Sequence, residues 1–126
     1  MTLVVDTSVL IQVLRGDTDA QSALEFAIRS GDRVTASVLS RVEVLAGMRP
    51  DEAHETQRLF ESLEWIGVDS ELADRAGELA SSYLRSHPGI DPVDYVIAAT
   101  SEHLGAALWT HNLKHFPMFP GLQRPY

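Results

Sequence analysis

Three acidic side chains stand out because each lies in apolar sequence, where charged residues are uncommon. Asp6 ends the apolar run TLVVD, Glu43 lies within RVEVLAG, and Asp94 lies in GIDPVDYVIAAT. Three such carboxylates would repel one another strongly if they converged, unless a cation joined them. Oxygen ligands in a chain without cysteine favour Mg²⁺, or alternatively Mn²⁺, over zinc. We therefore interpret Asp6, Glu43 and Asp94 as candidate metal ligands and catalytic residues.

Each of these acids also has a simpler structural explanation. Asp91 precedes Pro92 and is a natural helix N-cap, and Asp94 would then lie in the first helical turn, where the helix dipole favours a negative charge. Glu43 and Arg41 are compatible with an ordinary solvated helix face. Because the three acids are far apart in the sequence, no local motif decides between the two interpretations.

Several other polar residues lie next to these acids. Thr7 and Ser8 follow Asp6 directly, and their hydroxyls could bond a phosphate or a water on the metal. Helix capping alone also explains Thr7. His111 and His115 are possible general acids, but packing of the C-terminal segment explains them equally well.

The apolar pattern predicts the elements that must position these residues. Gly16, Gly31, Gly47 and Gly105 fall where helices should end. Strands are expected at 2–6, 33–37, 65–68 and 106–110, and helices at 7–16, 18–30, 38–47, 51–63, 70–86 and 92–104. This alternation predicts a single α/β domain over residues 1–126, a sandwich with a mainly parallel sheet. In such a sheet, functional residues gather beyond the carboxyl ends of the strands.

Composition narrows the classes of protein. The chain has 126 residues, 44% of them hydrophobic, which is enough to bury one core. Its 10 basic and 18 acidic residues give a formal charge of −8, which disfavours a protein that coats duplexes or membranes. An acidic chain can still take a nucleic-acid substrate when cations bind its carboxylates. We expect a cytoplasmic protein with no membrane association, since no signal or transmembrane pattern is present.

Four segments together resemble a known family. They are VVDTSVLI, SVLSRVEVLAG, DYVIAAT and LWTHNLKHF, and they occur in this order over the length of the chain. The sequence resembles the PIN-domain nucleases, and most closely the VapC-type toxins of bacterial toxin–antitoxin pairs. The resemblance implies a PIN-like α/β/α sandwich that cleaves RNA with Mg²⁺ held by Asp6, Glu43 and Asp94. It also implies a homodimer and a VapB-like antitoxin whose basic segment faces the acidic cleft.

The chain departs from the family in its last motif. Many relatives carry a further acid in the segment that reads THNLKHF here, where this chain offers Asn112 and His115. Asp91 is the candidate to replace that fourth acid. Asn112 is interpreted either as an active-site hydrogen-bonding residue or as a turn asparagine.

Two alternative functions remain open from the sequence. The missing acid is compatible with a non-catalytic PIN-fold protein that binds RNA or a partner. An acid at the end of the first strand also suits the nucleophile of an aspartyl-phosphate phosphatase. Those enzymes carry a second acid two residues on, where this chain has Ser8, and Lys114 is its only lysine.

Overall fold

The computed structural model describes residues 1–126 and contains one four-stranded sheet. The strands are β1 (Thr2–Val5), β2 (Arg33–Ser37), β3 (Glu64–Ile66) and β4 (Ala107–Trp109). Their order in the sheet is β3-β2-β1-β4, and every neighbouring pair is parallel. The predicted α/β class with a mainly parallel sheet is confirmed, and the sheet is parallel throughout.

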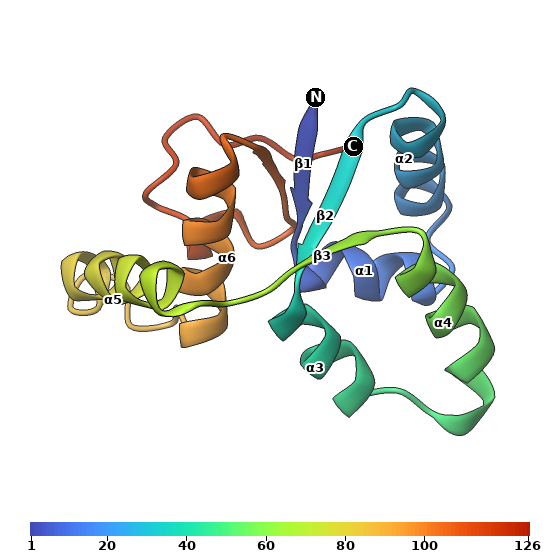
Figure 1. Cartoon of the computed structure of the whole chain (residues 1–126), viewed down its shortest axis with the longest axis horizontal. Helices are drawn as coiled ribbons and strands as arrows, with labels where there is room; N and C mark the ends of the chain where they lie inside the picture. The colour runs from blue at the N-terminus through green and yellow to red at the C-terminus, as the bar shows by residue number, and fades with distance from the viewer.

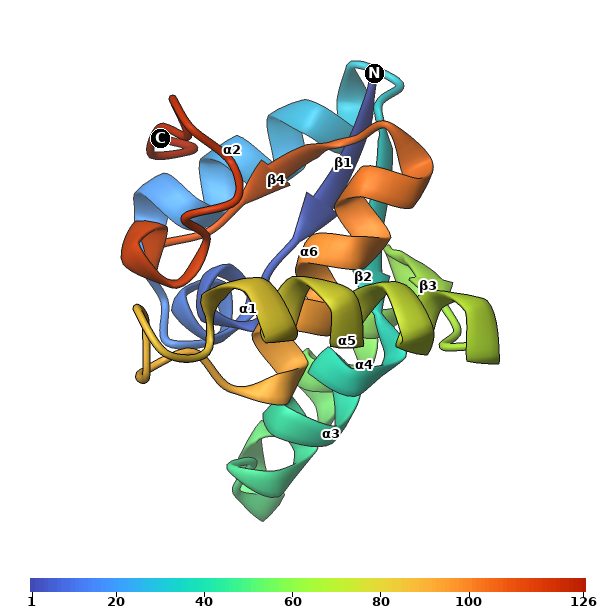
Figure 2. The ribbon, with the colours of Figure 1, turned by 90° about the vertical axis from the view of Figure 1, so that its left-hand side faces the viewer.

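Helices lie on both sides of this sheet. They are α1 (Thr7–Leu14), α2 (Thr18–Arg29), α3 (Val38–Ala46), α4 (Ala53–Glu61), α5 (Ser70–Tyr83) and α6 (Pro92–Leu104). Short 3₁₀ turns occupy Pro50–Glu52 and Leu113–His115. Figure 1 shows α1, α2 and α4 on one side of the strands and α5 and α6 on the other. Figure 2 looks onto the second side, where α5 crosses α6.

The alternation of β1 divides the core into two clusters. Leu3 and Val5 pack with buried residues of α1, α2 and α4, whereas Val4 packs with α5 and α6. Successive strand residues point to opposite faces, so a strand buried on both faces reads as an unbroken apolar run. All three side chains are at most 1% exposed. The apolar start of the sequence therefore becomes the central strand that both helical layers cover.

Several predicted boundaries differ from the structure. Helix α5 ends at Tyr83 rather than at residue 86, because Pro88 disfavours helical backbone in the residue before it. Helix α4 begins at Ala53, since the 3₁₀ turn at Pro50 takes up the start of the expected helix. Strand β3 covers 64–66 rather than 65–68. None of the helices has the length and apolar character needed to cross a membrane.

The parallel sheet places three chain segments at one edge. Asp6 follows β1, Thr110 follows β4, and the Asp6 N–H continues the ladder by donating to the Trp109 carbonyl at 2.8 Å. The first turn of α6 reaches the same edge, where Asp94 faces the segment that follows β4. Residues about 90 and 100 positions apart in the sequence therefore become neighbours.

We predict that the packing of α6 against the sheet contributes strongly to stability. Ile97→Ala should lower the free energy of unfolding by about 2–5 kcal/mol, because Ile97 is fully buried and its loss leaves a cavity. Ile28→Ala is the matched control, since Ile28 is 39% exposed, and should cost less than about 1 kcal/mol. Urea titrations at an unchanged m-value measure both effects. Equal losses in the two variants would contradict this account of the core.

Candidate functional site

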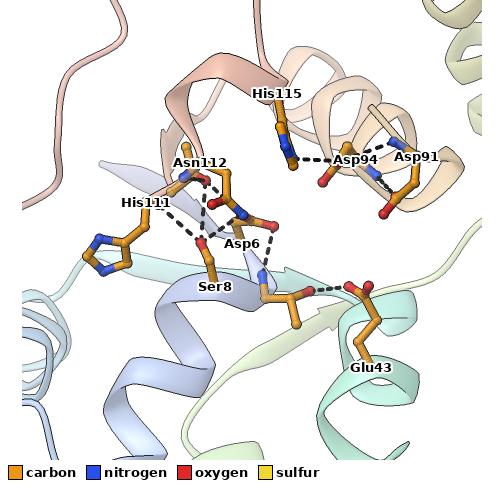
Figure 3. A network of polar contacts seen from close by, with 10 residues as sticks. Asp6, Ser8, Glu43, Asp91, Asp94, His111, Asn112 and His115 are labelled. Carbon is orange, nitrogen blue, oxygen red and sulfur yellow. Dashed lines mark hydrogen bonds and ion pairs between the residues drawn. The ribbon is translucent and has the colours of Figure 1, made fainter. Parts of the chain in front are cut away.

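The three candidate acids come from three different elements around the carboxyl edge of the sheet. Asp6 is the residue between β1 and α1, Glu43 lies on α3, and Asp94 is the third residue of α6. Asp6 and Asp94 are buried, at 2% and 7% exposure, and Glu43 is half-buried. Figure 3 shows the three acids on separate segments around one region, with Asp94 toward the top of the view and Glu43 toward the bottom.

The Asp6 carboxylate is held by three hydrogen bonds. Oδ1 accepts the Thr7 N–H at 2.8 Å, while Oδ2 accepts the Ser8 hydroxyl at 2.9 Å and the Thr110 hydroxyl at 2.7 Å. Asp6 is thereby the N-cap of α1. The prediction that Thr7 caps this helix is wrong, because the carboxylate one residue earlier already occupies that position.

The loop after β4 fixes the direction of these donors. The Asn112 N–H donates to Thr110 Oγ1 at 2.9 Å, and the His111 N–H donates to Ser8 Oγ at 3.1 Å. Each hydroxyl therefore accepts a backbone hydrogen and keeps its own proton for Asp6. In this structure Ser8 donates to Asp6, and its role as a ligand of a phosphate or a metal-bound water stays a prediction.

Asp91 and Asp94 form a capping box at the start of α6. Asp91 Oδ1 accepts the Asp94 N–H at 3.0 Å, and Asp94 Oδ2 accepts the Asp91 N–H at 3.3 Å. This reciprocal pair satisfies two backbone donors that a helix start leaves open. Asp91 is exposed, so capping accounts fully for its position. Its replacement of the missing fourth acid stays a prediction.

The buried position of Asp94 disfavours its negative charge. Burial is the main cause that raises the pKa of its carboxyl to about 6, and the negative charges of Asp91 and Asp6 raise it further. The hydrogen bond from the Asp91 N–H and the charge of His115 act in the opposite direction. The charged form of Asp94 is thus disfavoured in the folded protein without a cation.

The segment that lacks the expected acid places a histidine against Asp94. His115 Nδ1 lies 3.1 Å from Asp94 Oδ2, and 37% of its side chain is exposed. His115 therefore contacts one of the candidate acids, and its role as a general acid stays a prediction. The Asn112 side chain is exposed and makes no hydrogen bond within the protein, so its role in the active site also stays a prediction. His111 contacts the Tyr126 hydroxyl, away from the acids.

The Glu43 carboxylate accepts a hydrogen bond from a hydroxyl and contacts no other acid. Thr7 Oγ1 donates to Glu43 Oε1 at 2.6 Å, and Ser40 Oγ lies 2.8 Å from the same hydroxyl. Helix α3 packs against α1 so that Glu43 faces the first turn of α1. The side chain therefore points toward the site and not onto a solvated helix face.

The donor set fits a divalent cation in part. No three Asp, Glu or His side chains are close enough together to share an ion, so binding by all three acids stays a prediction. Asp94 uses Oδ2 for both of its contacts and leaves Oδ1 without a hydrogen bond. A pair of buried carboxylates with one raised pKa and a free oxygen has the chemistry that Mg²⁺ or Mn²⁺ satisfies.

Two contributing residues were missed at the sequence level. Thr110 donates to Asp6, and Ser40 contacts Thr7. Thr110 stands directly after an apolar strand, so the rule that found Asp6 could have found it too. Ser40 carries no such signal, because only the packing of α3 on α1 brings it to the site.

Comparison with known proteins places this site in a family. The PIN domain model matches residues 3–117. Ribonuclease VapC19 of Mycobacterium tuberculosis is 43% identical over 97% of this chain and 98% of its own length. Ribonuclease VapC10 of the same organism is 40% identical over 98% of this chain and 92% of its own length.

Solved structures agree in fold. A toxin–antitoxin complex from Klebsiella pneumoniae superposes with a TM-score of 0.77, at 27% identity and 98% coverage of both chains. The DNA-bound VapBC of Salmonella typhimurium superposes with a TM-score of 0.81 at 19% identity, over 98% of this chain and 96% of that one. With its parallel sheet and its acids at the carboxyl edge, this chain belongs to the PIN-domain family.

Proposed function

We propose that this protein is a metal-dependent endoribonuclease and the toxin of a VapBC-type toxin–antitoxin pair. The observation that carries the proposal is the pair of buried carboxylates, Asp6 and Asp94, at the sheet edge of a chain 43% identical to Ribonuclease VapC19. The phosphatase alternative has no comparable support. Asp6 directs both of its oxygens to hydrogen-bond donors of the protein, and Lys114 is exposed.

Asp6 and Asp94 would hold Mg²⁺ directly, with Mn²⁺ as the alternative, and Glu43 would hold it directly or through water. A bound divalent cation neutralises charge on the scissile phosphate and makes a water molecule more acidic. Ser8 and Thr110 keep the Asp6 carboxylate oriented through their hydroxyl protons. Glu43, or a further water on the metal, would accept the proton of the attacking water.

The negative charge of the site also bears on the partners that we propose. RNA is the substrate, and its backbone would approach the acidic edge only together with cations, since the chain carries a formal charge of −8. A VapB-like antitoxin would present a basic segment whose arginine pairs with the carboxylates. Solved relatives are described as VapBC or toxin–antitoxin complexes. We further propose a homodimer that acts in the cytoplasm.

We predict that the two buried acids are essential for cleavage. Asp6→Asn and Asp94→Asn should each lower the rate of RNA cleavage in Mg²⁺ by at least about 100-fold, because each removes a charged ligand. Asp74→Asn, at an exposed position on α5, is the matched control and should retain the full rate. Gel assays on folded proteins measure this. A wild type without activity in Mg²⁺ or Mn²⁺ would favour the non-catalytic alternative.

The raised pKa of Asp94 predicts a pH-dependent loss of stability. The folded protein binds a proton at this carboxyl up to about pH 6, whereas the unfolded chain releases it near pH 4. The contribution of Asp94 to stability without metal should therefore fall as the pH rises from about 4 to 6. Asp94→Asn removes this penalty, so in EDTA it should melt a few degrees above the wild type at pH 7 and lose that advantage toward pH 4.

Mg²⁺ provides the complementary measurement. It should raise the melting temperature of the wild type more than that of Asp94→Asn at fixed ionic strength, by mass action on the folded state. A variant that melts below the wild type in EDTA and responds equally to Mg²⁺ would show that Asp94 is only a helix-start acid. In that case the loss of a favourable dipole interaction explains the result.

Asp91→Asn tests the fourth-acid hypothesis separately. Asparagine caps a helix as well as aspartate, so the capping box predicts cleavage near the wild-type rate and a change in unfolding free energy within about 0.5 kcal/mol. Single-turnover cleavage and thermal melts measure both. A 100-fold loss of rate in a folded variant would instead identify Asp91 as the replacement for the missing acid.

A further inference from the structure

Thr7 is the one residue that hydrogen-bonds to two of the candidate acids. Its backbone N–H donates to Asp6 Oδ1 at 2.8 Å, and its side-chain hydroxyl donates to Glu43 Oε1 at 2.6 Å. The residue is 7% exposed, so both bonds lie in a largely dry environment. One residue thus connects the acid of the first strand with the acid of α3.

The Thr7 hydroxyl has one hydrogen and two acceptors within reach. Thr7 Oγ1 lies 2.6 Å from Glu43 Oε1 and 2.8 Å from Ser40 Oγ. The carboxylate is the nearer acceptor and the stronger one, so the hydrogen is directed to Glu43. Ser40 is fully buried and offers the second acceptor oxygen beside Thr7.

Glu43 depends on this contact for its direction. The structure gives its carboxylate no other hydrogen bond and no ion pair, although Arg41 lies on the same helix. Arg41 instead stacks its guanidinium on Phe60 and Trp65, at 4.6 and 4.7 Å from the ring centroids. A half-buried glutamate with three rotatable bonds loses its orientation readily when its single donor is removed.

Helix capping does not explain the Thr7 hydroxyl. Asp6 is the N-cap of α1, and the Thr7 hydroxyl takes no part in that cap. Alanine or valine at this position would serve the helix start equally well through the backbone N–H. The hydroxyl is therefore accounted for only by its contact with Glu43 and Ser40.

We propose that Thr7 is a positioning residue that fixes the Glu43 carboxylate relative to Asp6. The proposal rests on the proposed metal-dependent nuclease function and adds to it the residue that joins two of its acids. Thr7 itself contacts neither metal nor RNA in this scheme. It acts through the hydrogen bonds to Asp6 and Glu43.

The test compares Thr7→Val with Thr7→Ser. Valine has the shape of threonine without the hydroxyl, and serine keeps the hydroxyl without the methyl group. Thr7→Val should raise the Mg²⁺ concentration that gives half of the maximal thermal shift by about 10-fold or more, and lower the cleavage rate similarly. Thr7→Ser should stay within about 3-fold of the wild type.

A double-mutant cycle separates positioning from a general structural effect. If Thr7 acts through Glu43, Thr7→Val should add nothing to the metal response or the rate of Glu43→Gln. Independent effects that simply add in the Thr7→Val/Glu43→Gln protein would overturn the proposal. So would a loss in Thr7→Ser equal to that in Thr7→Val, because the hydroxyl would then be irrelevant.

The two readouts also distinguish this proposal from the proposed function. A wild type that binds Mg²⁺ without cutting RNA would contradict the nuclease function, while the metal titrations would still support Thr7 if they follow the expected order. A wild type that cuts RNA, together with a Thr7→Val protein that matches it in rate and metal response, would overturn the role of Thr7 alone. A wild type with no metal-induced shift overturns both.

Discussion

The buried carboxylate of Asp6 is the constraint on which the architecture of the site depends. A charge that is 2% exposed is tolerable only when its oxygens are hydrogen-bonded, and the donors come from Thr7, Ser8 and Thr110. These donors lie on the first turn of α1 and on the loop after β4, so satisfying one carboxylate joins two segments about 100 residues apart. The parallel pairing of β1 with β4 brings the loop within reach. The strand pairing that builds the fold therefore also orients this acid.

Asp94 is buried to a similar degree, but its carboxylate accepts fewer hydrogen bonds than that of Asp6. Its capping-box bond and its contact with His115 both use Oδ2, while burial and the neighbouring acids raise the pKa of the carboxyl to about 6. A protein selected for stability alone would neutralise or expose such a group. Residual repulsion of this kind is typical of sites where function is retained at a cost in stability. The contrast with Asp6 indicates a site in which the protein fixes one carboxylate and leaves the charge of the other for a ligand to balance.

The sequence predicted the elements well because they depend on local information. Apolar runs, glycine stops and the Asp91–Pro92 helix start are local signals, and Asp6 and Asp94 stand at element ends that those signals define. It failed where the partner of a side chain is set by tertiary packing. The assignment of Thr7 as a cap was wrong, and the hydroxyl instead contacts Glu43, which is far from it in sequence. The contact of His115 with Asp94 could not be predicted for the same reason.

The hydroxyl residues explain how the acids are oriented without lysine or arginine beside them. Thr7, Ser8 and Thr110 each have a single hydroxyl hydrogen to donate, and each donates it to a carboxylate. Lysine or arginine at these positions would neutralise the acids and compete with a cation for them. Hydroxyls orient the acids while leaving their negative charge in place. A site that must stay negative until a cation arrives is therefore better supported by threonine and serine than by salt bridges, and the ion pairs of Arg33 and Arg75 involve glutamates outside it.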